Sequence, residues 1–190
     1  MNLPAGVETE LTALYSRMDR EFDHSAARSG FICNGCEDNC CRTRFYHHTL
    51  AEWLYLRSGL TALAPEHRQQ IGARADAVRR QMVAMEGREE AMRIMCPLNE
   101  AGRCALYVHR PMICRLHGIP HCMRQPDGRL VTGPGCDDYY AQCGRIDARP
   151  LDRTPLYIAM AGLERRLREA LGFNRKIKLT VAEMIINEIY

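Results

Sequence analysis

The segment of residues 33–41, CNGCEDNCC, holds four cysteines, Cys33, Cys36, Cys40 and Cys41. Thiolate is a soft ligand that suits zinc and iron–sulfur clusters. The spacing Cys33-x-x-Cys36 lets two sulfur atoms bind one metal across a tight turn. Because the Cβ atoms of adjacent residues diverge, we expect Cys40 and Cys41 to point to different partners. The segment therefore predicts an irregular, metal-binding loop.

A second set of cysteines follows after a helical stretch, with seven and nine residues between its members: Cys96, Cys104 and Cys114. A turn at residues 99–102 can bring the first two together. Pro111 can start a helical turn that presents the third. We therefore expect one site, where the loop 33–41 meets the segment 96–122, with helices as its frame.

The whole chain of 190 residues contains ten cysteines and has a net charge of +3. No export signal or membrane-spanning run is visible, which predicts a cytoplasmic protein with no membrane partner. Thiols in that compartment favour metal binding over disulfides. The mild net charge gives no reason to expect nucleic acid as a partner.

The remaining candidate ligands lie after these two sets. Cys122 follows two histidines, His117 and His121, and histidine can replace cysteine at zinc or Rieske-type iron. Cys136 and Cys143 suit either a second metal or buried thiols. We interpret the histidines as surface or outer-sphere residues, and include all ten cysteines as candidate ligands. The histidines interpreted in this way are His47, His48, His117 and His121.

Two blocks of sequence, in order, resemble a known family. The first is the CxxCxxxCC pattern of 33–41; the second comprises CPL at 96–98, GRCALY at 102–107 and RPMICR at 110–115. Over about residues 32–122 they resemble bacterial cysteine-cluster proteins of the YkgJ type, described as zinc- or iron-chelating domains. The resemblance implies metal binding by the seven cysteines of the blocks. One branch, the flagellin lysine N-methylases, implies an iron–sulfur cluster used with S-adenosylmethionine.

Ligand counting limits the possible metal centres. Seven clustered cysteines exceed the four that one zinc ion takes. They fit two zinc ions, one zinc with spare thiols, or one 4Fe–4S cluster with thiols nearby. We predict a 4Fe–4S cluster as cofactor, with zinc as the alternative. Arginines flank the cysteines and can offset the negative charge of the bound thiolates: Arg42, Arg44, Arg103, Arg110 and Arg115.

Apolar periodicity and capping patterns predict a mostly α protein. Four to five helices frame a loop-rich cysteine core with one or two short β-hairpins. We expect a single domain, 1–190, with an N-terminal helix within 1–30 and a cysteine core at 31–145. The core holds a helical insert at 49–90, and further helices lie at 150–190. Capping boxes are expected at Thr49–Glu52 and Thr180–Glu183.

Three functions remain open. The first is a metal-binding protein with a redox or metal-handling role. The second is a structural zinc module that binds another protein. The third is a metal-dependent group-transfer enzyme, such as a protein N-methylase. Common nucleotide-binding and hydrolase motifs do not occur in the sequence.

Overall fold

A computed structural model describes residues 1–33, 40–87, 93–144 and 149–189. Within these ranges the chain is mostly helical, as the sequence predicts, but it has seven α-helices rather than the expected four to five. The α-helices are α1 (Ala5–Ser29), α2 (Leu50–Thr61), α3 (Pro65–Ala84), α4 (Met112–Leu116), α5 (Asp137–Cys143), α6 (Thr154–Leu171) and α7 (Val181–Ile186). The prediction was low because α4 and α5, of five and seven residues, are too short to show an apolar repeat. The 3-10 turn η1 (Cys40–Arg42) closes the first cysteine segment.

The two expected hairpins are present. The first pairs β1 (Asn99–Glu100) with β2 (Arg103–Cys104), and the second pairs β3 (His121–Arg124) with β4 (Leu130–Gly133). The sequence did not predict β5 (Leu151–Asp152), which pairs in parallel with β3 and completes a sheet of order β4-β3-β5.

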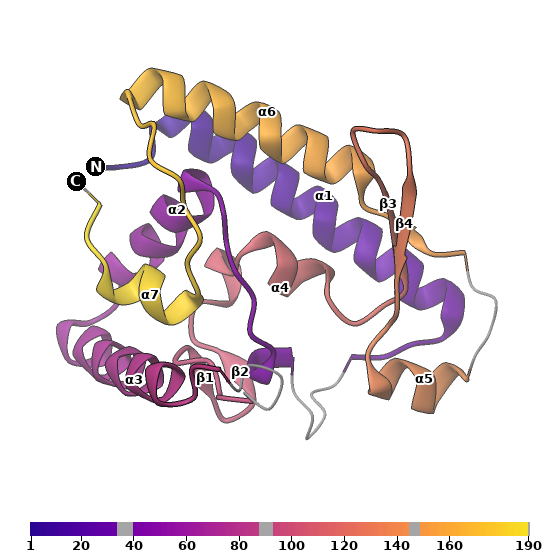
Figure 1. The fold of residues 1–190 in the computed structure, drawn as a ribbon, viewed down its shortest axis with the longest axis horizontal. Helices are drawn as coiled ribbons and strands as arrows, with labels where there is room; N and C mark the ends of the chain where they lie inside the picture. The colour runs from indigo at the N-terminus through magenta and orange to yellow at the C-terminus, as the bar shows by residue number, and fades with distance from the viewer. Residues whose placement is uncertain (34–39, 88–92, 145–148, 190) are drawn as a thin grey trace.

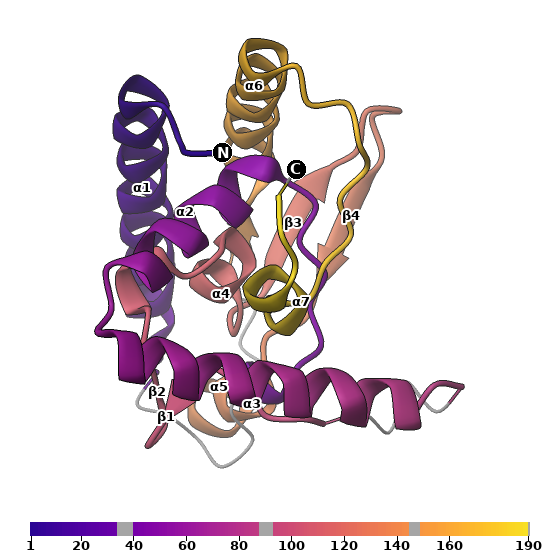
Figure 2. The ribbon, with the colours of Figure 1, turned by 90° about the vertical axis from the view of Figure 1, so that its left-hand side faces the viewer.

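Of the three long helices, α1 and α6 lie on one side of the molecule and α3 lies on the opposite side (Figures 1 and 2). α1 and α6 lie side by side, and α2 packs beneath them against α7 (Figures 1 and 2). The apolar face of α1 buries Leu11, Leu14 and Met18 in the main core. The helix ends at Gly30, whose φ of 73° is the left-handed conformation that glycine adopts without strain. This frame supports the cysteine-rich loops below it.

The two predicted capping boxes differ. Thr180 and Glu183 form one at the start of α7. At α2, Thr49 accepts a hydrogen bond from the Glu52 backbone N–H. The Glu52 carboxylate accepts from the Thr49 hydroxyl at 2.6 Å and from the Met112 backbone N–H at 2.9 Å. Glu52 thus anchors the first residue of α4 as well as stabilising its own helix.

In the described part of the chain, no helix has the length and apolar character needed to cross a membrane.

Candidate metal-binding site

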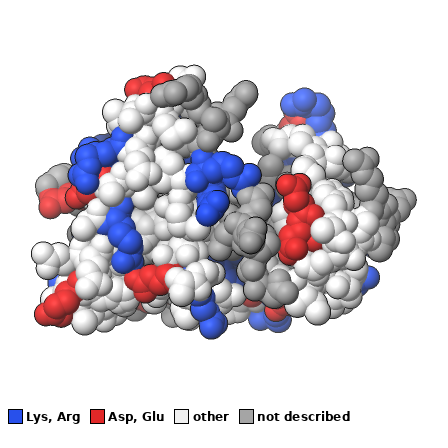
Figure 3. Space-filling view, turned by 90° about the horizontal axis from the view of Figure 1, so that it is seen from below, with Lys and Arg blue, Asp and Glu red and all other residues white. Residues whose placement is uncertain are grey.

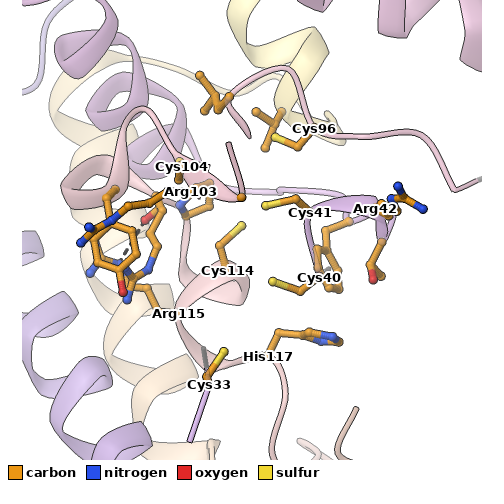
Figure 4. A pocket seen from close by; sticks show the side chains of 18 of the residues that line it. Cys33, Cys40, Cys41, Arg42, Cys96, Arg103, Cys104, Cys114, Arg115 and His117 are labelled. Carbon is orange, nitrogen blue, oxygen red and sulfur yellow. Dashed lines mark hydrogen bonds between the residues drawn. The ribbon is translucent and has the colours of Figure 1, made fainter. Parts of the chain in front are cut away.

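A cavity of about 1060 Å³ lies where the two cysteine sets meet, as expected. Its walls come from the second half of α1, η1, α3, the β1–β2 hairpin, α4 and the start of α7. Six of the described cysteines line it: Cys33, Cys40, Cys41, Cys96, Cys104 and Cys114. Figure 4 shows their side chains around a common space. Cys36 lies outside the described residues.

Backbone hydrogen bonds hold the two cysteine sets together. The N–H of Cys96 donates to the carbonyl oxygen of Cys41 at 2.8 Å, which joins residues 55 positions apart. In the β1–β2 hairpin, Asn99 pairs with Cys104, and the Asn99 N–H donates to the Cys96 carbonyl. The hairpin therefore sets Cys96 and Cys104 beside η1.

Cys114 enters the cavity from α4. Pro111 precedes the first residue of this helix, and Glu52 of α2 accepts the Met112 N–H. The guanidinium of Arg115 donates to Asp19 of α1 at 2.6 Å. These contacts fix the helix on both sides of Cys114, so its thiol is placed by two distant elements.

Four thiols form a mutually interacting set, here called the inner thiol group: Cys41, Cys96, Cys104 and Cys114. Burial, with smaller contributions from the neighbouring Cys41 and Cys104, raises the pKa of Cys96 to about 12. Burial likewise raises the pKa of Cys104 and Cys114, with contributions from other members of the group. Close thiolates repel one another, so a cation among them would be stabilised by all four.

Cys40 and Cys41 form a hydrogen-bonded pair. That they bind different partners stays a prediction. Both line the same cavity, because the η1 turn brings their side chains to one side (Figure 4). The hydrogen bond from Cys40 lowers the pKa of Cys41 to about 6; burial opposes this shift and the Asn99 side chain supports it. The same hydrogen bond, and then burial, raise the pKa of Cys40. Of the two thiols, Cys41 therefore has the lower pKa.

The structure places three cysteines away from the described cavity wall; we call them the outlying cysteines. Cys122 lies half-buried on β3, where its charged neighbours include Asp152 and arginines. Cys136 caps α5, since its sulfur accepts the Tyr139 N–H at 3.4 Å. Cys143 is buried in the main core. Burial raises the pKa of Cys136, and the charges of Asp138 and of the cavity-lining Cys33 contribute to the increase.

The five arginines that flank the cysteines in sequence all line the cavity. Arg110 and Arg115 share the carboxylate of Asp19, at 2.9 and 2.6 Å. The view from below shows basic side chains near the middle of that face (Figure 3). Among the described residues of the wall, five arginines stand against two aspartates, Asp19 and Asp23, so this part of the wall is positively charged before any thiol ionises. Such a wall suits an anionic, thiolate-bound centre.

The histidines divide between two environments. His117 lines the cavity with its ring 5.1 Å from that of Phe45, whereas His121 lies on β3. His47 also lines the cavity and is buried, so it is not a surface residue, while His48 is exposed. The sequence drew attention to His47 by its place after Cys41, whereas it carried no signal for Asp19, which reaches the site through tertiary packing.

The sulfur donors of the cavity are of the chemical type that binds soft metal centres. The thiols surround a space and do not converge on one point: within the described ranges, no three Cys, His, Asp or Glu side chains are arranged to hold a metal ion. Iron–sulfur clusters bind their thiolates through separate iron atoms, so their ligands lie farther apart than around one ion. The residues present are therefore compatible with a cluster.

Comparison of the chain with protein-family models, with curated proteins and with solved structures finds no match. The family resemblance of the two cysteine blocks therefore stays a prediction.

Proposed function

We propose that the protein binds a metal cofactor in this cavity, an iron–sulfur cluster of the 4Fe–4S type, with ligands from the inner thiol group. The observation that carries the proposal is the convergence of six thiols, from segments more than 50 residues apart, on one cavity. Cysteine is the usual ligand of such clusters, and four thiolates satisfy one. When bound, a cluster of this kind supplies one-electron redox chemistry.

Three groups of residues would have different roles at the bound cofactor. The inner thiol group would hold the cofactor, with three of its four pKa values raised, so binding would release protons. Cys40 would donate its S–H to the Cys41 sulfur, a contact that disperses charge on a ligand. The wall arginines would offset the negative charge of the bound centre. The group-transfer alternative stays a prediction.

The test is metal, sulfide and absorption analysis of protein purified without oxygen. Iron and acid-labile sulfide in near-equal amounts, with a broad band near ~400 nm from sulfur-to-iron charge transfer, would support the proposal. Stoichiometric zinc in a colourless protein would replace the cluster with the zinc alternative, and the search for a protein partner would follow. Protein free of both, which takes up neither on reconstitution, would refute metal binding.

A further inference from the structure

Three arginines of the cavity wall, here called the arginine cluster, lie close to Tyr107: Arg103, Arg110 and Arg115. The guanidinium carbon of Arg110 lies 3.8 Å from the centre of the Tyr107 ring, and that of Arg103 lies 5.2 Å from it. Figure 4 shows Arg103 and Arg115 on the same side of the cavity, near Cys104. The charge of Arg110 opposes the burial that raises the pKa of Cys104. The arginine cluster therefore borders the inner thiol group.

The arginine cluster has few acceptors for its N–H groups. Among the described residues, its ion pairs go to the single carboxylate of Asp19, which Arg110 contacts at 2.9 Å and Arg115 at 2.6 Å. The exposed guanidinium of Arg103 makes no hydrogen bond or ion pair with any described residue and contacts the Tyr107 ring alone. Nε and Nη1 of Arg110 are buried and also lack a hydrogen-bond partner there. Because charged groups in such places are normally paired, an anion would stabilise this part of the wall.

The cavity is larger than a metal centre requires. Bonds between a metal and thiolate sulfur are about 2.3 Å long, so a 4Fe–4S core is only a few ångströms across. The cavity has a volume of about 1060 Å³. Pockets that hold small organic molecules have volumes of about 300–1,000 Å³. A cluster would therefore leave room for an organic molecule beside it.

An apolar wall continues from the arginine cluster along α1. Asp19, Phe22, Asp23 and Ala26 line the cavity, and their spacing of three and four residues places them on one face of the helix. Since Asp19 holds Arg110, the ring of Phe22 follows one turn further along the same wall. Asp23 would repel an anion, so the charged group of a ligand belongs at the arginine end. The rest of the ligand would then lie against Phe22 and Ala26.

We propose that the cavity binds, beside the metal centre, a small organic anion whose carboxylate or phosphate group contacts Arg103 and Arg110 and whose apolar body lies against α1. The inference rests on the proposed function and deepens it, because it names the class of ligand that shares the cavity with the centre. Arg103 immediately precedes Cys104 on β2, so the bound anion would lie next to an inner thiol.

The probes are benzoate, phenyl phosphate, benzyl alcohol and acetate, each titrated into the metal-loaded, full-length protein in a calorimeter. Benzoate and phenyl phosphate have both the charge and the apolar body, whereas benzyl alcohol lacks the charge and acetate lacks the body. We expect one or both of the aromatic anions to bind at least about tenfold more tightly than the other two probes, since a hydrogen bond to a charged group contributes at least that factor.

Variants locate the bound anion. Arg103→Gln should weaken binding of the aromatic anion by about tenfold or more. Arg103→Lys should lose less, because it keeps the charge but not the planar fork. Arg79→Gln is the matched control: it removes the same charge from an exposed arginine of α3 that lies outside the described cavity wall. Its affinity should stay within about twofold of the wild type, because salt screens distant surface charges.

Binding of benzoate alone would assign the site to carboxylates, and binding of phenyl phosphate alone would assign it to phosphates. No binding of either aromatic anion, or equal losses in Arg103→Gln and Arg79→Gln, would overturn the inference. Metal content is measured on the same samples. If the protein takes up no metal, the proposed function fails, and the same titrations on the metal-free chain still decide whether the arginine cluster binds an anion.

Discussion

The inner thiol group and the outlying cysteines contain the same side chain in different surroundings. The inner thiols face one another across a cavity with a positively charged wall. The outlying thiols serve other purposes: Cys136 caps a helix and Cys143 fills the core. A cysteine becomes a candidate ligand through its neighbours, and neither its spacing nor its burial alone separates the two groups.

Removing an inner thiol should have the largest effect. We expect Cys114→Ser to lower the affinity for Zn²⁺ or Co²⁺ by more than about 100-fold, because losing an outer-sphere partner alone costs up to that amount. Cys122→Ser, on β3, is the matched control and should bind as the wild type does. Competition with a chromophoric chelator measures both. Equal losses in the two variants would remove the distinction between the groups.

Metal affinity should rise steeply with pH. Burial raises the pKa of Cys96 to about 12 and also raises those of Cys104 and Cys114, so these thiols are protonated at pH 7 to 8. A bound cation must displace their protons, so acid opposes binding and base favours it. With two or more protons released, we expect the Zn²⁺ affinity to increase at least about 100-fold from pH 7 to pH 8.

The measurement for this second prediction is chelator competition at the two pH values, with proton release recorded in weak buffer. The Zn²⁺ affinity of Cys122→Ser should change with pH as that of the wild type does, because the metal displaces no proton from Cys122. An affinity that does not change with pH would mean that the ligands are already ionised, in conflict with the burial of the inner group.

The smallest effects should come from the outlying cysteines, and on stability only. Cys143 is 7% exposed in the main core, so Cys143→Ser buries a hydroxyl there and should lower the free energy of unfolding by about 1–3 kcal/mol. Cys122→Ser should change it by less than about 0.5 kcal/mol. Urea unfolding of the metal-free proteins measures both. Unchanged metal content in Cys143→Ser is the accompanying expectation, and its loss would place that thiol among the ligands.

Local patterns predicted much of the fold. The helical spacing of apolar residues predicted the buried faces of α1, α3 and α6. The capping box predicted at Thr180–Glu183 is present. Both hairpins follow from their turn residues. The parallel pairing of β3 with β5 was not predictable, because it joins residues about 30 positions apart without a turn between them. The sequence also gave no cue for α5, since cysteine is an unusual N-cap.

The order of the two cysteine blocks predicted where the cavity lies and which cysteines line it, but not the contacts that hold the blocks together. The hydrogen bond from Cys96 to Cys41 brings the blocks together, and no spacing rule encodes it. Glu52 shows what local sequence patterns miss. Its sequence context indicates a capping box, but its carboxylate also accepts a hydrogen bond from the backbone of α4. Tertiary contacts of this kind decide which thiols share a cavity.

The most direct test is to compare alkylation of every cysteine in the metal-free and metal-loaded protein, by mass spectrometry. The account predicts that loading slows the reaction at inner thiols, including Cys104 and Cys114, and leaves the rate at Cys122 unchanged. Protection of Cys122 with continued reaction of the inner thiols would contradict it and place the metal elsewhere in the molecule.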